Sequence, residues 1–236
     1  MTLIVHEVHA VNGRHEDEFD ALWRDEWIPA VGSGDDTRVL HFLRHAHGTG
    51  ASYRVVTLTG VRDAEALGSM MDRVDGGDLA PLARRMDALR HDVDAKILRP
   101  LPWSEGVVDL ATVPTHGVDH RAALFMEDTV WPDVGNLERY VEQSGAHYAD
   151  WMGSDANNET EMLHIEAAYR TAWGSGRRRE IVLWQRVTRL DWIPGLLTVE
   201  VPERLKEPGT WMHDALQLRD QWESKLLRST RWSPLA

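Results

Sequence analysis

The chain contains one segment twice, and this internal repeat restricts the possible folds more than any other feature of the sequence. Each copy reads Asp-Ala-Leu, then Lys-Ile/Leu-Leu-Arg, then Trp-Ser, and the spacing from Lys to Trp is the same in both. The first copy covers residues 87–104 and the second covers residues 214–233. Repetition over so long a period indicates that the chain consists of two copies of one structural unit.

The first copy of the unit shows the hydrophobic patterns of strands and amphipathic helices in a definite order. Alternating apolar residues predict strands over residues 2–11, 37–46, 53–61 and 96–101. Helical spacing predicts a helix beginning at residue 16, a short helix over residues 64–71, and a helix whose apolar face runs from Leu79 to Val93. The resulting order, β-α-β-β-α-β, is the ferredoxin-like motif.

The second copy repeats this order with a longer insertion. Strands are predicted over residues 121–130, 161–173, 178–187 and 225–228, helices over residues 134–151 and 211–222, and a long loop over residues 192–209. A stretch with Gly, Pro and Thr and little periodicity joins the two copies. We therefore divide the chain into a first half (1–104), a linker (105–120) and a second half (121–236).

A four-stranded sheet with both helices on one face leaves its other face bare, and that face must be buried. Two copies can bury it against each other. The predicted fold is therefore α+β, with two tandem ferredoxin-like βαββαβ units forming an eight-stranded barrel within one chain. Such a barrel has room for a few side chains or one small ligand. The chain needs no partner to close this barrel, and both a monomer and a homodimer remain open.

Short motifs in both halves carry a resemblance to a known superfamily. They are His6-Glu7-Val8-His9, the turn Asn12-Gly13, the helix Phe19-x-x-Leu22-Trp23, and the strands Val55-Val56-Thr57-Leu58 and Leu183-Trp184-Gln185-Arg186. With them the chain resembles the dimeric α+β barrel superfamily in a tandem form, and within it NIPSNAP-like and antibiotic-biosynthesis-monooxygenase-like members. The resemblance implies small-molecule chemistry, because the superfamily includes cofactor-free monooxygenases, polyketide cyclases, lactone isomerases and haem-handling enzymes. Its Asn-Trp-His oxygenase set has no clean match here, so the activity must be argued from the site.

Composition narrows the class of partner. A formal net charge of −12 disfavours nucleic acid and anionic membranes, and the absence of cysteine excludes thiolate zinc sites and a cysteine nucleophile. No apolar run is long enough to span a bilayer and the N-terminus lacks a signal-peptide pattern, so we expect a cytoplasmic protein. Eleven Trp and twelve His suit a pocket for a small organic molecule.

Candidate catalytic residues come from the second strand of each half. Alternation places His41 and His45 on one face of the first of these strands, and the matching strand carries His164 and Glu166. The more apolar face should pack under the helices, so these four side chains are expected to line the barrel. His41 and His164 are expected at equivalent positions, facing each other. Imidazole beside a carboxylate is a plausible acid/base group, although buried histidines can also be purely structural.

Candidate substrate-binding residues come from other strands. His6 lies on one face of the first strand, Glu7 and His9 lie on the other, and either face could point inward. Further candidates are Glu127 on the matching strand and, as pocket walls, Tyr53 and Trp184.

Two short runs of His or Arg residues lie at predicted hairpin turns. His45-Ala46-His47 has a spacing that can bind zinc or iron, but without a third ligand we predict no metal. The run Arg177-Arg178-Arg179 is expected to cap a hairpin in solvent, the alternative being that it selects an anionic substrate at a barrel mouth.

These features lead to one leading hypothesis and two alternatives. The leading hypothesis is a cofactor-free enzyme that cyclises, isomerises or eliminates an apolar or aromatic substrate by acid/base chemistry. The first alternative is cofactor-free oxygenation of a phenolic substrate. The second is a binding protein for haem or another apolar ligand, without catalysis.

Overall fold

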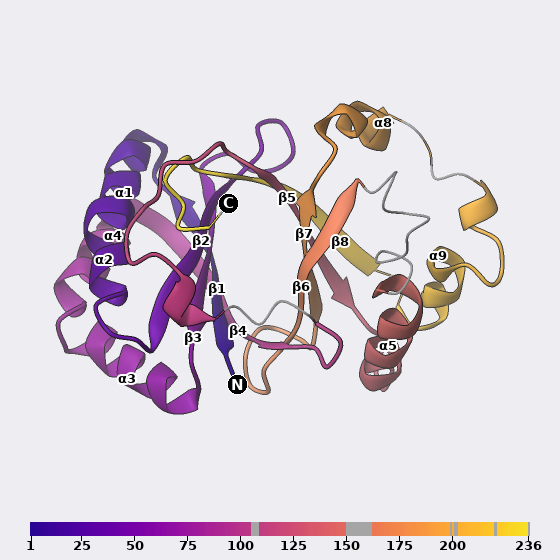
Figure 1. Cartoon of the computed structure of the whole chain (residues 1–236), viewed down its shortest axis with the longest axis horizontal. Coiled ribbons are helices and arrows are strands. Elements are labelled where there is room, and N and C mark those ends of the chain that lie inside the picture. Colours follow the sequence, from indigo (N-terminus) through magenta and orange to yellow (C-terminus); the bar gives the residue numbers. More distant parts are fainter. Residues whose placement is uncertain (105–108, 150–161, 199, 201–202, 220, 236) are drawn as a thin grey trace.

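The computed structural model describes residues 1–104, 109–149, 162–198, 200, 203–219 and 221–235. Within these residues, eight antiparallel strands close into one barrel in the order β1-β3-β2-β8-β5-β7-β6-β4. Helices of the first half cover one side of the barrel and helices of the second half cover the opposite side (Figure 1). The predicted fold, two tandem ferredoxin-like units in an eight-stranded α+β barrel, is confirmed.

The elements follow the predicted order in both halves, except that a helix occupies part of the segment predicted as a loop (192–209). The first half contains β1 (Leu3–Val11), α1 (Glu16–Leu22), α2 (Ile28–Val31), β2 (Thr37–His45), β3 (Arg54–Val61), α3 (Ala64–Asp75), α4 (Ala80–Leu89) and β4 (Arg90–Pro100). The second half contains β5 (Leu124–Trp131), α5 (Leu137–Gln143), β6 (Leu163–Thr171), β7 (Ile181–Val187), α8 (Ile193–Thr198), α9 (Trp211–Asp214) and β8 (Gln221–Ser229). Among the described residues, no helix combines the length and the hydropathy that crossing a bilayer requires.

The two halves join along two short seams. Strand β2 pairs with β8 through three residue pairs, from Leu43↔Ser229 to His45↔Leu227. Strand β4 pairs with β6 through another three, from Leu98↔Thr171 to Pro100↔Tyr169. Pairing within each half is longer, as along β1 and β4. The barrel is therefore closed by two equivalent contacts between halves, as two copies of one unit require.

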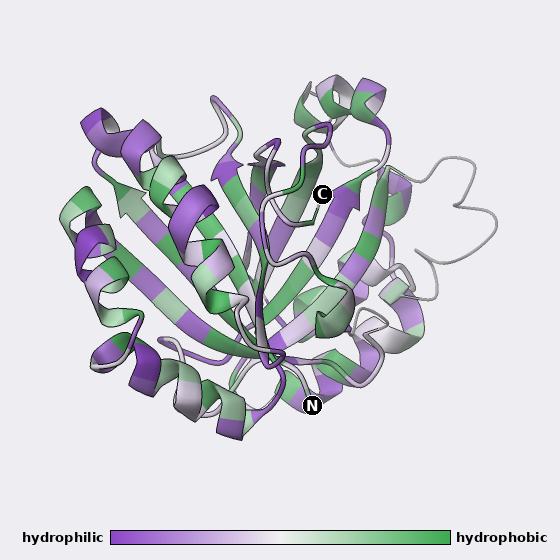
Figure 2. Cartoon of the chain, turned by 60° about the vertical axis from the view of Figure 1, so that its left-hand side comes forward, coloured by the Kyte–Doolittle hydropathy of each residue, from purple (hydrophilic) through white to green (hydrophobic). Residues whose placement is uncertain are grey.

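Apolar side chains fill the space on both faces of the barrel wall. Leu43, Leu58 and Trp184 belong to a cluster inside the barrel, which Leu110 of the linker also joins. Under the helices of the first half, Phe42 packs in a separate cluster, and another lies under those of the second half. Strands accordingly show alternating hydrophilic and hydrophobic bands (Figure 2). This alternation directs one set of side chains inward, where a site can form.

Bulges in β2 and β6 change the alternation that the sequence predicts. The pairing with β3 shifts between Val39 and His41, and the pairing with β7 shifts between Ile165 and Ala167. Each bulge inserts one unpaired residue and reverses the facing of the residues before it. Val39, expected inside, therefore packs under the helices, while Leu40, expected there, packs inside the barrel.

Two predicted helices end earlier than their apolar spacing suggests. The helix expected to reach Val93 ends at Leu89, because β4 already begins at Arg90 and pairs with β1. Likewise Trp222, expected in the last helix, lies in β8. Ladder hydrogen bonds to the neighbouring strand outweigh helical periodicity at these positions. The helix predicted over residues 134–151 begins at Leu137 and continues into a π-helical turn (Ser144–Ala149), and residues 150 and 151 lie outside the described residues.

The repeated Trp-Ser pairs link each half to the other. Ser104, after β4, accepts a hydrogen bond from the N–H of Ala168 in the second half at 2.9 Å. Ser233, after β8, accepts one from the N–H of Phe42 in the first half at 3.1 Å. The neighbouring Trp side chains also contact the opposite half. The indole N–H of Trp103 donates to a carbonyl of α5, and the ring of Trp232 packs on Phe42. We call these two arrangements the Trp-Ser clasps.

Candidate functional site in the barrel

One part of the barrel interior is charged, unlike the apolar cluster described above. A pocket of about 310 Å³ opens there, and its walls also include Val8, Thr129 and Trp131. Its charged or titratable lining residues are His6, Asp94, Lys96, Arg177, Arg178, Glu180, Glu223 and Lys225. A pocket of this size suits a small molecule, and such a lining favours a polar one.

The centre of this site is a contact between His6 of β1 and Glu127 of β5. The Nε2 atom of His6 lies 2.7 Å from Oε2 of Glu127, and the two side chains are 1% and 0% exposed. His6 pairs with Leu58 in the barrel wall, and Glu127 pairs with Trp184. These pairings place His6 and Glu127 at equivalent positions of the two halves, so the internal symmetry brings them together.

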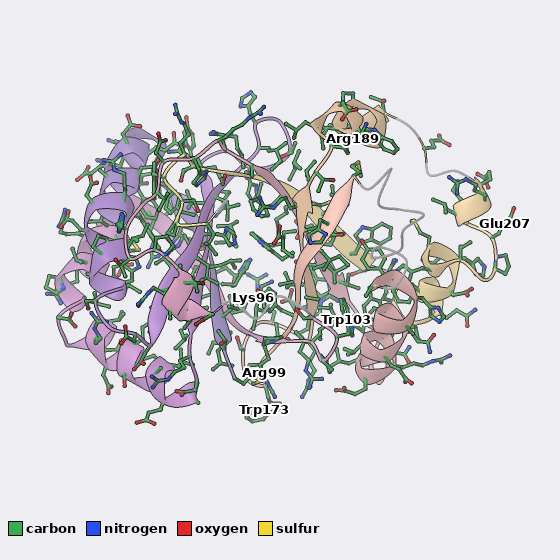
Figure 3. The ribbon with its side chains drawn as sticks, in the orientation of Figure 1. Lys96, Arg99, Trp103, Trp173, Arg189 and Glu207 are labelled. Atoms are coloured by element: carbon green, nitrogen blue, oxygen red, sulfur yellow. The ribbon has the colours of Figure 1, made fainter. Side chains whose placement is uncertain are left out.

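Two lysines flank this pair at equivalent positions. Lys96 lies opposite His6 in the β1–β4 ladder, and Lys225 lies opposite Glu127 in the β5–β8 ladder. The Nζ atom of Lys225 is 3.3 Å from Oε1 of Glu127 and 3.1 Å from Glu223, and that of Lys96 is 3.2 Å from Glu180. Lys96 extends into the middle of the barrel (Figure 3).

Charges within the site hold its groups ionised. Burial alone would raise the pKa of Glu127, but the attraction and hydrogen bond of His6 and the charge of Lys225 outweigh it, so the pKa is lowered. Burial opposes the charge on Lys225, yet Glu127 and Glu223 raise its pKa above the ordinary value. The site therefore contains a carboxylate and an ammonium group at neutral pH.

Glu127 contacts only one of the two ring nitrogens of His6. Its Nε2–H can donate to Glu127, which fixes the orientation of the ring. Its Nδ1 atom is buried and has no hydrogen-bond partner among the described residues. His6 lines the pocket, and Nδ1 is the ring nitrogen that Glu127 does not contact.

The expectation that His41 and His164 face each other inside the barrel is wrong. His41 lies inside, packed on Phe125 and Trp184, but His164 is exposed. The pairing of His41 with Leu58 corresponds to that of Ala167 with Trp184, so Ala167 is the true equivalent of His41. Aligning Leu163-His164 with Leu40-His41 therefore shifts β6 by three residues relative to its true match with β2.

The remaining catalytic candidates lie in different environments. Burial and the Arg186 guanidinium lower the pKa of His41 to about 3, so its ring is neutral in the apolar part of the interior. Glu166, the extra residue of its bulge, forms an ion pair with Arg186 and does not line the pocket. Burial and the charge of Lys225 lower the pKa of His45, whose buried Nε2 has no partner among the described residues.

The faces of β1 are now assigned. His6 shares the inner face with Val8, whereas His9 packs on Phe19 and Trp23 under the helices. Glu7 shares the face of His9. Burial raises its pKa, and Thr57 is its hydrogen-bond donor at 3.5 Å. Glu7 and His9 therefore lie outside the pocket.

The two aromatic wall candidates also lie away from the pocket. Tyr53 is exposed, with a left-handed backbone (φ 58°), and its ring lies over Gly13. Trp184 is fully buried and stacks on Phe125 in the apolar cluster. Neither side chain forms part of the pocket lining.

Sequence reasoning missed Lys96 and Lys225 as site residues. Both begin the repeated Lys-Ile/Leu-Leu-Arg run, and a conspicuous repeat of a charged residue within predicted strands was the signal that could have found them. A lysine kept at the same register in both copies must point to the same side of the wall, toward the shared interior.

The described side chains offer little to a metal or a haem. No group of three or more His, Asp or Glu residues that could hold a metal occurs among them. The pocket does not fit a haem either, because a porphyrin needs broad apolar walls and these walls carry paired charges.

Comparison with known proteins shows the fold. No protein-family model matches the chain, and no curated protein does. The chain is similar to the solved structure of a putative monooxygenase from Lactobacillus acidophilus NCFM, with 7% identity over 98% of this chain and 97% of that chain and a TM-score of 0.57. It is also similar to the structure of an anthrone oxidase-like protein, with 7% identity over 97% of this chain and 91% of that chain and a TM-score of 0.55. A chlorite dismutase from Candidatus Nitrospira defluvii, in complex with imidazole, is also similar (10% identity, 97% and 91%, TM-score 0.54). The chain therefore shares the fold of these proteins, here an eight-stranded α+β barrel whose two halves are supplied by one polypeptide.

Proposed function

We propose that the protein is a cofactor-independent enzyme that moves a proton on a small, oxygen-containing organic molecule bound in the barrel pocket. The observation that carries this proposal is the buried His6–Glu127 pair, in which Glu127 orients the ring and leaves Nδ1 of His6 without a partner among the described residues. A histidine held in this way by a carboxylate is suited to general acid/base catalysis.

The proposed step is proton abstraction next to a carbonyl group. Nδ1 of His6 takes the proton from carbon, and the electron pair of the broken C–H bond moves to the carbonyl oxygen as an enolate. The ammonium groups of Lys96 and Lys225 line the same pocket and stabilise the negative oxygen. Return of the proton to a different carbon gives an isomer, and departure of a leaving group gives an elimination product.

The pocket lining supports a change in the expected substrate. The leading hypothesis from the sequence expects an apolar or aromatic substrate, yet the pocket walls carry ionic groups. A polar or charged small molecule matches those walls better, because burying an apolar surface there would leave charged groups without solvent.

Proton exchange tests the proposal without knowledge of the natural substrate. Small 1,3-diketones and β-keto acids are incubated with the protein in D₂O, and loss of the carbon-bound ¹H NMR signal is followed. His6→Gln should slow catalysed exchange by roughly 10²–10⁴-fold, the usual contribution of a general base. His164→Gln, which changes an exposed histidine outside the pocket, is the matched control and should retain the wild-type rate. Wild-type exchange in a folded His6→Gln variant would reject the role of His6.

Oxygenation of a phenolic substrate is the second candidate, and the comparisons favour it specifically. Two proteins of this fold are named for oxygenation or oxidation. Deprotonation of a phenol by His6 would be its first step, so the same base serves both reactions. Oxygen uptake with small dihydroxyarenes separates them, because acid/base isomerisation consumes no oxygen.

A further inference from the structure

The deeper cations of the pocket already have carboxylate partners. Lys96 contacts Glu180, and Lys225 contacts both Glu127 and Glu223. Both lysines are mostly buried, so these pairs are only weakly screened by solvent. A permanent carboxylate on the substrate therefore gains little by displacing Glu180, Glu127 or Glu223 from these lysines, and a cation without such a partner would hold it better.

The two arginines of the β6–β7 hairpin that line the pocket differ in what they contact. The guanidinium of Arg178 lies 4.4 Å from the ring centre of Trp131, and its Nη2 donates to Gln221 at 3.2 Å. Arg177 also lines the pocket and is exposed, but it forms no hydrogen bond or ion pair with any residue that the structure describes. Arg177 is thus a cation at the pocket rim whose donors are free for a ligand.

Resting on the proposed function, we infer that the substrate is a small monocarboxylic acid whose carboxylate binds Arg177 while its reacting end lies at His6. Guanidinium presents a planar pair of donors that matches the two oxygens of a carboxylate. His6 and Arg177 line the same pocket of about 310 Å³, which restricts the acid to a compact molecule. The basic run is therefore assigned a role in substrate selection instead of merely capping a hairpin.

The rim also carries a charge that limits the substrate to one carboxylate. Asp94 of β4 lines the pocket, is exposed, and has no ion pair or hydrogen bond to another described side chain. It repels a second negative group, whereas a single carboxylate can bind on the Arg177 side. Asp94 therefore distinguishes monocarboxylic acids from dicarboxylic acids.

Binding of three probes tests this inference separately from turnover. Benzoate, its uncharged counterpart benzamide, and the dicarboxylate isophthalate are titrated calorimetrically into the full chain at fixed ionic strength. Wild-type protein should bind benzoate more tightly than either of the other two. Arg177→Gln should weaken benzoate binding by roughly 2–5-fold, the usual contribution of a solvent-exposed ion pair, and leave benzamide binding unchanged.

Matched variants separate a specific role from a general effect of charge. Arg179→Gln removes the same charge from the same hairpin, outside the pocket lining, and should leave benzoate binding near the wild-type value. Asp94→Asn should strengthen isophthalate binding several-fold relative to benzoate. Equal losses in Arg177→Gln and Arg179→Gln, equal affinity for benzoate and benzamide, or no binding of benzoate at all would each overturn the inference. Loss of proton exchange in His6→Gln tests the proposed function alone, because these titrations require no turnover.

Discussion

His41 gives the protein a dependence of stability on pH whose sign and size can be worked out. Its ring is buried between Phe125 and Trp184, with ring centres 5.2 Å and 5.4 Å away. Burial, assisted by the Arg186 guanidinium, lowers the pKa of His41 to about 3 in the folded protein, from an ordinary value of 6.5. As the pH falls below 6.5, the unfolded chain binds a proton here and the folded protein does not, so stability falls with the pH.

The size of this stability change follows from the difference between the pKa values of His41 in the unfolded and folded states. Each pH unit between the two pKa values contributes about 1.4 kcal/mol, so acidification from pH 7 to pH 5 should remove about 2 kcal/mol of stability through this one residue. Other groups titrate over the same pH range. The contribution of His41 is therefore obtained by comparing how the free energy of unfolding changes with pH in the wild type and in variants that lack the His41 ring. His41→Phe and His41→Leu both remove the titrating ring but differ in size.

Urea unfolding followed by circular dichroism at a series of pH values is the measurement. Wild-type stability should fall more steeply between pH 7 and pH 5 than that of either variant, and by the same excess of about 2 kcal/mol for both. A packing defect would instead change the free energy of unfolding of each variant by an amount that is the same at every pH. Parallel curves for wild type and both variants would show that the His41 ring takes up a proton in the folded state, and would refute the argument from burial.

Three further predictions concern single contacts. Glu127→Gln removes the charge of the buried pair and should lower the free energy of unfolding by about 1–3 kcal/mol in urea titrations, whereas Glu26→Gln, in an exposed ion pair, should cause no measurable change. Ser233→Ala leaves a buried N–H of β2 without its acceptor and should cost about 1–3 kcal/mol, measured likewise. Gly145→Ala places a Cβ atom 2.6 Å from Trp103, so it should cost about 1–3 kcal/mol and shift the Trp103 indole N–H signal in NMR spectra.

Much of the fold was predictable from the sequence because the repeat and the strand periodicity agree. Two copies of a unit with one bare sheet face have few ways to bury it, so the eight-stranded barrel follows from the pattern. The ends of α4 and α9 were not predictable from periodicity. Arg90 and Gln221 already belong to strands whose partners lie far away in the sequence. The division of the chain at residues 104 and 121 stays a prediction.

The site was predictable only in part, because its geometry depends on register. His6 and Glu127 were both candidates, but their direct contact follows from the pairings of β1 and β5 within the closed barrel. His164 was misaligned because the two Leu-His pairs are not equivalent, and the bulge at Glu166 has no recognisable sequence signal. An extra residue in a strand moves the side chains on one side of it to the opposite face of the sheet, and the hydrophobic pattern of the strand alone cannot reveal this.

The Trp-Ser clasps have a consequence for how this chain can be divided. Each half ends in a segment that completes the other half, so neither half has its full set of buried contacts alone. A nick within the linker would leave two fragments that hold each other through these exchanged ends as well as through both seams. The smallest piece able to reach the native structure is therefore the pair of halves, and a lone half would have to recruit a second copy of itself.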